Sequence, residues 1–157
     1  MNRKIFLDLD GVMADFEGHF LSQFGIAHNS VSDKEMWKKI DSLYHFFWDL
    51  PLMDGAVDFF KSIEKYNPII LTSCPKTNYQ AAAIQKKKWV KKYLSQEILV
   101  LPILGGRNKA LFMHNEGDIL IDDMEKNCVS WTEHEGYAIR HKDFDNTTKE
   151  LNLILRG

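Results

Sequence analysis

The fold is decided by residues 5–15, Ile5-Phe6-Leu7-Asp8-Leu9-Asp10-Gly11-Val12-Met13-Ala14-Asp15. Its first five residues form an apolar run that only Asp8 interrupts, which is typical of a buried strand. Asp8 and Asp10 stand at the carboxyl end of this strand, where open α/β sheets bind ligands, and Gly11 permits a sharp turn after them. Two ionised carboxylates this close repel each other, and a divalent cation removes the repulsion. The stretch therefore predicts an oxygen-ligand metal site beside a carboxylate that is free for chemistry.

Two ordinary interpretations of this stretch compete with a catalytic one. Asp-x-Asp-Gly also opens calcium loops, and a lone copy can be a plain turn. A calcium loop requires further oxygen ligands, a closing Glu and flanking helices. Asp15 is within range, but the other spacings are absent and a strand precedes the motif. The calcium loop is therefore disfavoured, and the plain turn has to be weighed against motifs further along the chain.

Length and composition indicate one soluble domain with a sizeable core. The chain has 157 residues, of which 45% are hydrophobic and 27% charged, as is ordinary for globular proteins. A formal net charge of −2 gives no overall attraction to nucleic acid or anionic membranes, so local groups have to hold any anionic ligand. Cys74 and Cys128 form no metal-spaced pair and weakly favour a reducing compartment. With no signal-like or membrane-length apolar run, we expect a cytoplasmic protein with neither a nucleic acid polymer nor a membrane as partner.

Apolar strands alternate with helical patterns along the chain. After the first strand, further strands are predicted at residues 68–72, 98–101, 118–122 and 137–140. Helices are predicted at residues 14–25, 32–40, 54–66, 78–95, 108–115, 124–135 and 147–155. This alternation predicts right-handed βαβ units and an α/β fold with a central parallel sheet.

A helical insertion follows the first strand. It contains a capping box, Ser32-Asp33-Lys34-Glu35, and an aromatic cluster, Tyr44-His45-Phe46-Phe47-Trp48, before Pro51. The insertion is too long for a turn, and we expect it to cover the site.

The helix at residues 78–95 is rich in lysine. Its predicted buried residues are Ile84, Trp89, Tyr93 and Leu94. The run Lys86-Lys87-Lys88 could bind nucleic acid, but a solvated helix face is the favoured interpretation because the chain is acidic overall.

Polar groups follow three of the predicted strands. They are Asp8 and Asp10, then Thr72 and Ser73, then Asp122 and Asp123, and Lys109 lies between the last two pairs. Taken singly, the hydroxyl pair or the later acid pair could cap a helix, and the lysine could be an ordinary surface residue. Taken together, parallel strands bring them to one sheet edge.

These residue types match the needs of phosphoryl transfer. One carboxylate can attack phosphorus and a second can move the leaving-group proton. Hydroxyls and a lysine can hold the phosphoryl oxygens, and further acids can complete a Mg²⁺ site.

Four segments resemble the signatures of the haloacid-dehalogenase (HAD) phosphohydrolase superfamily. They are Asp8-Leu9-Asp10-Gly11-Val12, Thr72-Ser73, Lys109 and Asp122-Asp123. Within that superfamily the chain resembles the 5′(3′)-deoxyribonucleotidases, through residues 8–17, 50–57, 88–94 and 107–109. The resemblance extends to about residue 130. It implies a HAD-like Rossmannoid parallel sheet flanked by helices, with a core of residues 1–14 and 52–157 and a small helical cap of residues 15–51.

The resemblance also implies roles for the acidic residues. Asp8 would be the nucleophile and Asp10 the acid/base. Asp8, the backbone carbonyl of Asp10 and Asp123 would hold Mg²⁺, whereas Asp122 would be a weaker ligand or a support for the others.

The implied substrate contacts come from other segments. Thr72, Ser73 and Lys109 would bind phosphate, Phe16 would pack on the nucleoside, and Lys76 would be a further substrate contact. The aromatic residues Phe46-Phe47-Trp48 could line a base pocket, but internal packing of the cap is the favoured interpretation.

The expected function is hydrolysis of nucleoside monophosphates by a Mg²⁺-dependent phosphatase, with deoxyribonucleotides favoured. Two alternatives stay open: a HAD phosphatase for another small phosphomonoester, and a phosphoacceptor or nucleotide-binding module without turnover. The stretch Cys74-Pro75-Lys76 gives no base preference. A homodimer is compatible with the resemblance, and the oligomeric state is left open.

Overall fold

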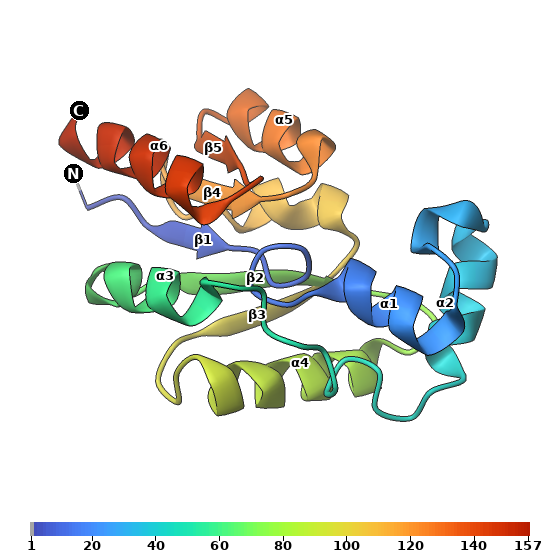
Figure 1. Cartoon of the computed structure of the whole chain (residues 1–157). Coiled ribbons are helices and arrows are strands. Elements are labelled where there is room, and N and C mark those ends of the chain that lie inside the picture. The colour runs from blue at the N-terminus through green and yellow to red at the C-terminus, as the bar shows by residue number, and fades with distance from the viewer. Residues whose placement is uncertain (1) are drawn as a thin grey trace.

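The structure, a computed structural model, describes residues 2–157 and contains a five-stranded parallel sheet with helices on its two faces (Figure 1). In chain order the strands are β1 (Ile5–Leu7), β2 (Ile69–Cys74), β3 (Val100–Leu104), β4 (Ile119–Asp122) and β5 (Tyr137–Arg140). Their order across the sheet is β3-β2-β1-β4-β5, so β1 is central. The predicted α/β class with a parallel sheet is confirmed.

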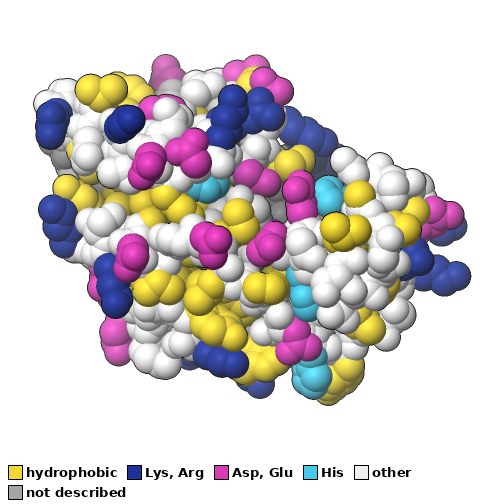
Figure 2. Space-filling model, in the orientation of Figure 1, with side chains coloured by type: hydrophobic (Ala, Val, Ile, Leu, Met, Phe, Trp, Pro, Cys, Tyr) yellow, Lys and Arg dark blue, Asp and Glu magenta, His cyan; other side chains and the backbone are white. Residues whose placement is uncertain are grey.

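Helices occupy most of the connections between strands. They are α1 (Phe16–Phe24), α2 (Asp33–Asp41), α3 (Ala56–Ile63), α4 (Tyr79–Tyr93), α5 (Glu125–Glu133) and α6 (Phe144–Arg156), with short 3₁₀ segments η1 (His28–Ser30), η2 (Glu64–Tyr66) and η3 (Gly106–Phe112). Within residues 2–157, none of these helices combines the length and the apolar character needed to cross a bilayer. Figure 2 shows acidic and basic side chains interspersed over the face of the molecule that it presents.

The first strand is shorter than the predicted run of residues 5–9. It ends at Leu7, and the Leu9 carbonyl then accepts hydrogen bonds from the amides of Val12, Met13 and Ala14. Gly11 adopts a φ of 83° in this turn. Asp8 therefore extends the strand edge, whereas Asp10 belongs to a tight loop. The α-helix expected at residues 108–115 is instead the 3₁₀ segment η3, which spans Gly106–Phe112.

Alternating side chains of the sheet build a core on each face. Ile5 and Leu7 of β1 pack in a cluster that includes Trp89 of α4, whereas Phe6 points to the other face. There Phe6 lies against Trp131 of α5, with ring centroids 5.1 Å apart. With both faces covered, the carboxyl ends of the central strands hold their side chains in fixed positions.

The segment between β1 and α3 carries α1 and α2 at one end of the molecule (Figure 1). The hydroxyl of Ser32 accepts a hydrogen bond from the Glu35 amide (3.3 Å), which confirms the predicted N-cap. Gly25 ends α1 in the left-handed conformation with a φ of 71°, as expected for a helix stop. The indole of Trp89 donates to the Leu50 carbonyl (2.8 Å) and so ties the end of this segment to α4.

Two rings of the aromatic cluster, those of Phe46 and Phe47, are buried in the interior. Phe46 is 2% exposed and its ring lies near those of Phe16, His19, Phe20 and Phe24. Internal packing is therefore confirmed for Phe46 and Phe47. The division of the chain into a core and a cap at residues 15–51 stays a prediction.

The predicted burial pattern of α4 is partly wrong. Trp89 is fully buried as expected, but Ile84 is 54% exposed. Lys86, assigned to a solvated face, is only 1% exposed, whereas Lys87 and Lys88 face solvent. The burial of Lys86 is possible because acceptors at the sheet edge satisfy its ammonium group, as described below.

Acid is expected to weaken the packing of the α1–α2 segment through His19. Burial lowers the pKa of His19 below its ordinary value of 6.5 and outweighs the opposing effect of Asp49 and Asp15. The unfolded chain therefore binds this proton more readily than the folded one. The stability that the neutral ring contributes is present above about pH 6.5 and is lost as the pH falls through the lowered pKa.

We expect His19→Gln to flatten the dependence of the unfolding free energy on pH between about pH 7 and 5, measured by urea denaturation. The matched control is His45→Gln, because His45 is exposed on the same segment and should leave the slope unchanged. An unchanged slope in the His19 variant would show that its protonation is not coupled to folding.

Candidate active site

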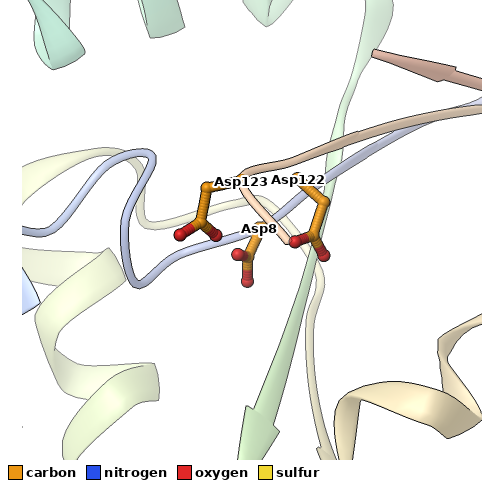
Figure 3. Close-up of side chains that lie close together, drawn as sticks. All are labelled: Asp8, Asp122 and Asp123. Atoms are coloured by element: carbon orange, nitrogen blue, oxygen red, sulfur yellow. The ribbon is translucent and has the colours of Figure 1, made fainter. Parts of the chain in front are cut away.

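Three carboxylates converge at the carboxyl ends of β1 and β4 (Figure 3). Asp8 directly follows β1, Asp122 is the last residue of β4, and Asp123 comes next. The Asp8 amide donates to the Ile121 carbonyl (2.9 Å), which continues the pairing of the two parallel strands and sets the carboxylates side by side. One oxygen from each lies within 4.8 Å of those of the other two. The prediction that Asp8 lies beside Asp122 and Asp123 is confirmed.

Lys109 from η3 is the cation of this cluster. Its ammonium donates to Asp8 Oδ1 (2.8 Å) and to Asp122 Oδ2 (2.6 Å), and the side chain is 1% exposed. Burial disfavours the charged lysine, but the carboxylates of Asp8 and Asp122 prevail and raise the pKa of Lys109 above its ordinary value. Lys109 is therefore a buried cation, and its interpretation as an ordinary surface lysine is excluded.

The acids still carry more negative charge than one lysine neutralises. Burial raises the pKa of Asp8 well above its ordinary value, Asp122 adds to the rise, and Lys109 opposes it only in part. Burial also raises the pKa of Asp123. A cluster in which ionisation is this costly fits a divalent cation, because the cation stabilises all the ionised carboxylates at once.

The two acids after β4 differ in how their oxygens are used. Asp122 is fully buried, and it accepts hydrogen bonds from Lys109, from Asn127 Nδ2 (3.1 Å) and from the Met124 amide (2.8 Å). Asp123 Oδ1 is buried without a hydrogen-bond partner. An unpartnered buried carboxylate oxygen is costly unless something else coordinates it. This observation fits a hard cation held by Asp8 and Asp123, with Asp122 as their support.

Gly11 makes room for this arrangement. A Cβ atom at that position would overlap the Asp123 carboxylate, and the backbone there has a positive φ. Only glycine meets both demands without strain.

Asp10 lies in the loop after Asp8 and is joined to the hydroxyl pair through a second lysine. Lys86 donates to Asp10 Oδ2 (2.7 Å), to Thr72 Oγ1 (3.1 Å) and to the Ser73 carbonyl (2.6 Å). Asp10 Oδ1 has no hydrogen-bond partner. Thr72 and Ser73 lie within β2, just before its last residue Cys74, and do not cap α4, whose N-cap residue is Asn78. The hydroxyl pair and Asp10 therefore share one edge of the sheet.

Two residues predicted to contact the substrate, Phe16 and Lys76, are not part of the hydrogen bonds described above. Phe16 is half-buried, and its ring lies near those of Phe20, His28 and Phe46. Lys76 is exposed in the loop after β2. Their roles toward a substrate stay predictions.

Two residues of the site, Lys86 and Asn127, were not predicted from the sequence. Lys86 follows Ala82 and precedes Trp89 on the buried stripe of α4, and this spacing is the signal that could have found it. Asn127 holds Asp122 and packs where a Cβ atom on Gly106 would collide with it. No sequence pattern distinguishes such an asparagine from a surface one.

Comparisons with known proteins identify relatives of this chain. The model of the family "5′ nucleotidase, deoxy (pyrimidine), cytosolic type C protein" matches residues 2–149. Among curated relatives, a putative 5′(3′)-deoxyribonucleotidase of Acanthamoeba polyphaga mimivirus is 30% identical over 142 residues, covering 76% of this chain and 62% of that protein. The mitochondrial 5′(3′)-deoxyribonucleotidase of Homo sapiens is 28% identical over 149 residues, covering 76% and 61%. The chain thus spans little more than three fifths of these two relatives.

Solved structures share the fold. A hydrolase from Streptococcus pneumoniae TIGR4 superposes with a TM-score of 0.55 at 14% identity, covering 97% of this chain and all of that one. A putative haloacid dehalogenase-like hydrolase from Burkholderia xenovorans LB400 gives a TM-score of 0.52 at 12% identity, covering 87% and 81%. The predicted fold, a parallel sheet flanked by helices, is therefore shared with these two hydrolases.

Proposed function

The chain belongs to the 5′ nucleotidase, deoxy (pyrimidine), cytosolic type C family, and from this premise we propose that it is a Mg²⁺-dependent phosphatase of nucleoside monophosphates that favours deoxyribonucleotides. The observation that carries the proposal is the buried Asp8 carboxylate, held by Lys109 beside Asp122 and Asp123 at the carboxyl edge of the sheet. The names of the curated relatives support the choice of substrate.

Asp8 is the proposed nucleophile. Its Oδ1 already accepts hydrogen bonds from Lys109 and from the Leu9 amide (2.9 Å), which leaves Oδ2 as the attacking atom. Attack of Oδ2 on phosphorus forms an aspartyl-phosphate as the bond from phosphorus to the nucleoside oxygen breaks. Asp10 gives its proton to that oxygen, then removes a proton from the water that releases phosphate and restores Asp8.

The remaining residues hold the phosphoryl group and the metal. Thr72, Ser73 and Lys109 are the proposed phosphate contacts. The proposed Mg²⁺ ligands are Asp8, the backbone carbonyl of Asp10 and Asp123. When bound there, Mg²⁺ would offset the negative charge of the phosphoryl oxygens and favour the ionised form of the nucleophile.

Four expectations accompany this proposal and stay predictions. Phe16 and Lys76 contact the substrate, residues 15–51 act as a cap over it, the protein is cytoplasmic, and its partner is a small molecule.

A panel of substrates tests the proposal. We expect phosphate release with Mg²⁺ from deoxyribonucleoside monophosphates to exceed release from sugar phosphates by at least about tenfold in kcat/KM, and EDTA to abolish it. Release from sugar phosphates alone would keep the chemistry and overturn the substrate. A folded protein that becomes phosphorylated without turnover would instead support a phosphoacceptor.

A further inference from the structure

Lys86 is a buried cation for which the proposed reaction gives no role. It projects from α4 to the ends of β1 and β2 and is 1% exposed. Its ammonium group also lies 4.7 Å from the centre of the Phe47 ring. A lysine is almost never buried this completely unless acceptors bind its ammonium group, so the partners of Lys86 indicate its role.

The hydrogen bonds of Lys86 leave it no proton for a substrate. An ammonium group has three donors and no acceptor. All three are used, on Asp10 Oδ2, Thr72 Oγ1 and the Ser73 carbonyl, at 2.6 to 3.1 Å. Lys86 therefore differs from Lys109, which makes two such bonds and keeps a third proton for a phosphoryl oxygen.

The same bonds decide what the partners of Lys86 can offer. Thr72 Oγ1 accepts from Lys86, so its own proton remains available to a phosphoryl oxygen. Asp10 has Oδ2 fixed by Lys86, whereas its Oδ1 is buried and without a partner. One oxygen of Asp10 is thus anchored and the other is left to exchange a proton.

We propose that Lys86 is a positioning residue that anchors Asp10 Oδ2 and so presents Oδ1 to the leaving-group oxygen. The inference rests on the proposed function and extends it. Lys86 touches neither phosphate nor metal in this scheme; it acts through Asp10. Without Lys86, Asp10 is no longer held in the position from which it transfers its proton, whereas phosphate can still bind.

Two leaving groups separate this role from others. A nucleoside oxygen needs a proton to leave, whereas p-nitrophenolate leaves without one. We expect Lys86→Met to lower kcat/KM for a deoxyribonucleoside monophosphate by about 100-fold and for p-nitrophenyl phosphate by less than about tenfold. We compare kcat/KM because it reports only the steps up to the first irreversible one. Attack of water on the aspartyl-phosphate comes later and does not affect it. The matched control Lys87→Met, on the exposed face of the same helix, should change neither value.

A double variant tests whether Lys86 acts through Asp10. In an Asp10→Asn background, adding Lys86→Met should cost less than about threefold, because the group that Lys86 positions is already gone. Inhibition by inorganic phosphate should change less than about threefold in Lys86→Met, because Lys86 has no proton for phosphate. Partial unfolding lowers both rates by the same factor, so the ratio between the two substrates is unaffected. Lys86→Gln, which keeps a donor, is the second variant if the methionine protein does not fold.

The outcomes distinguish the two proposals. Equal losses on both substrates, an undiminished effect without Asp10, or weaker phosphate inhibition would each overturn the positioning role while leaving the phosphatase intact. A folded wild-type protein with no activity on either substrate would overturn the proposed function and, with it, this role of Lys86.

Discussion

Asp8→Asn is expected to lower phosphate release by at least about 10⁴-fold while the protein keeps its fold. The amide has nearly the shape of the carboxylate but no nucleophilic oxygen, so the aspartyl-phosphate cannot form. Stability should be unchanged or slightly higher without metal, because burial raises the pKa of Asp8 and makes its ionisation costly in the folded state. Lys109 still has Asp122 as its partner.

The measurement is steady-state phosphate release, with urea denaturation as the check on folding. Asp58→Asn is the matched control, because it makes the same chemical change on an exposed position of α3. Its activity should equal that of the wild type. A folded Asp8→Asn protein with near-wild-type turnover would show that another residue is the nucleophile.

Mg²⁺ should raise the melting temperature of the wild-type protein, and Asp123→Asn should remove most of this rise. Ligand at 100 times its Kd stabilises a folded protein by about 2.7 kcal/mol, an effect easily resolved for a chain of this size. Asp123 presents a buried oxygen without a partner, and an amide in its place lacks the charge that a hard cation requires. We therefore expect at least about tenfold weaker Mg²⁺ binding and a parallel loss of activity.

Glu125→Gln is the control for this second experiment. Glu125 is an exposed acid two residues further on, so its removal changes the local charge equally without touching the cluster. It should keep the Mg²⁺-dependent rise. If Asp123→Asn responds to Mg²⁺ as the wild type does, Asp123 is not a ligand.

The strands and the acidic edge were predictable because they follow from strong local signals. Short apolar runs bury on both faces of a parallel sheet, and polar residues that follow them must lie at one edge. Asp8, Asp122 and Lys109 met as expected for this reason. The end of β1 was less predictable, because the Leu9 turn depends on backbone hydrogen bonds that any residue can make.

The errors arose where distant contacts override residue type. Lysines in a row favour a solvated face, and for Lys87 and Lys88 that is correct. Lys86 is buried because Asp10 from the loop after β1, and Thr72 and Ser73 from β2, accept its hydrogen bonds. Ile84 is exposed because the buried stripe of α4 runs through Lys86 instead.

Gln85, the neighbour of Lys86 on α4, has a consequence for how this protein can diversify. Its side chain accepts from the amides of Phe47 and Trp48 (3.2 Å each) and donates to the Tyr44 carbonyl (3.0 Å). All three partners are backbone atoms: two are amides, which every residue type except proline supplies, and one is a carbonyl, which every residue type supplies. Phe47 is buried in the core, but the side chains at positions 44 and 48 can therefore be exchanged, in evolution or in a designed library, while their backbone stays bound to the helix. Such exchanges can change what these side chains bind while the backbone of the loop keeps its conformation.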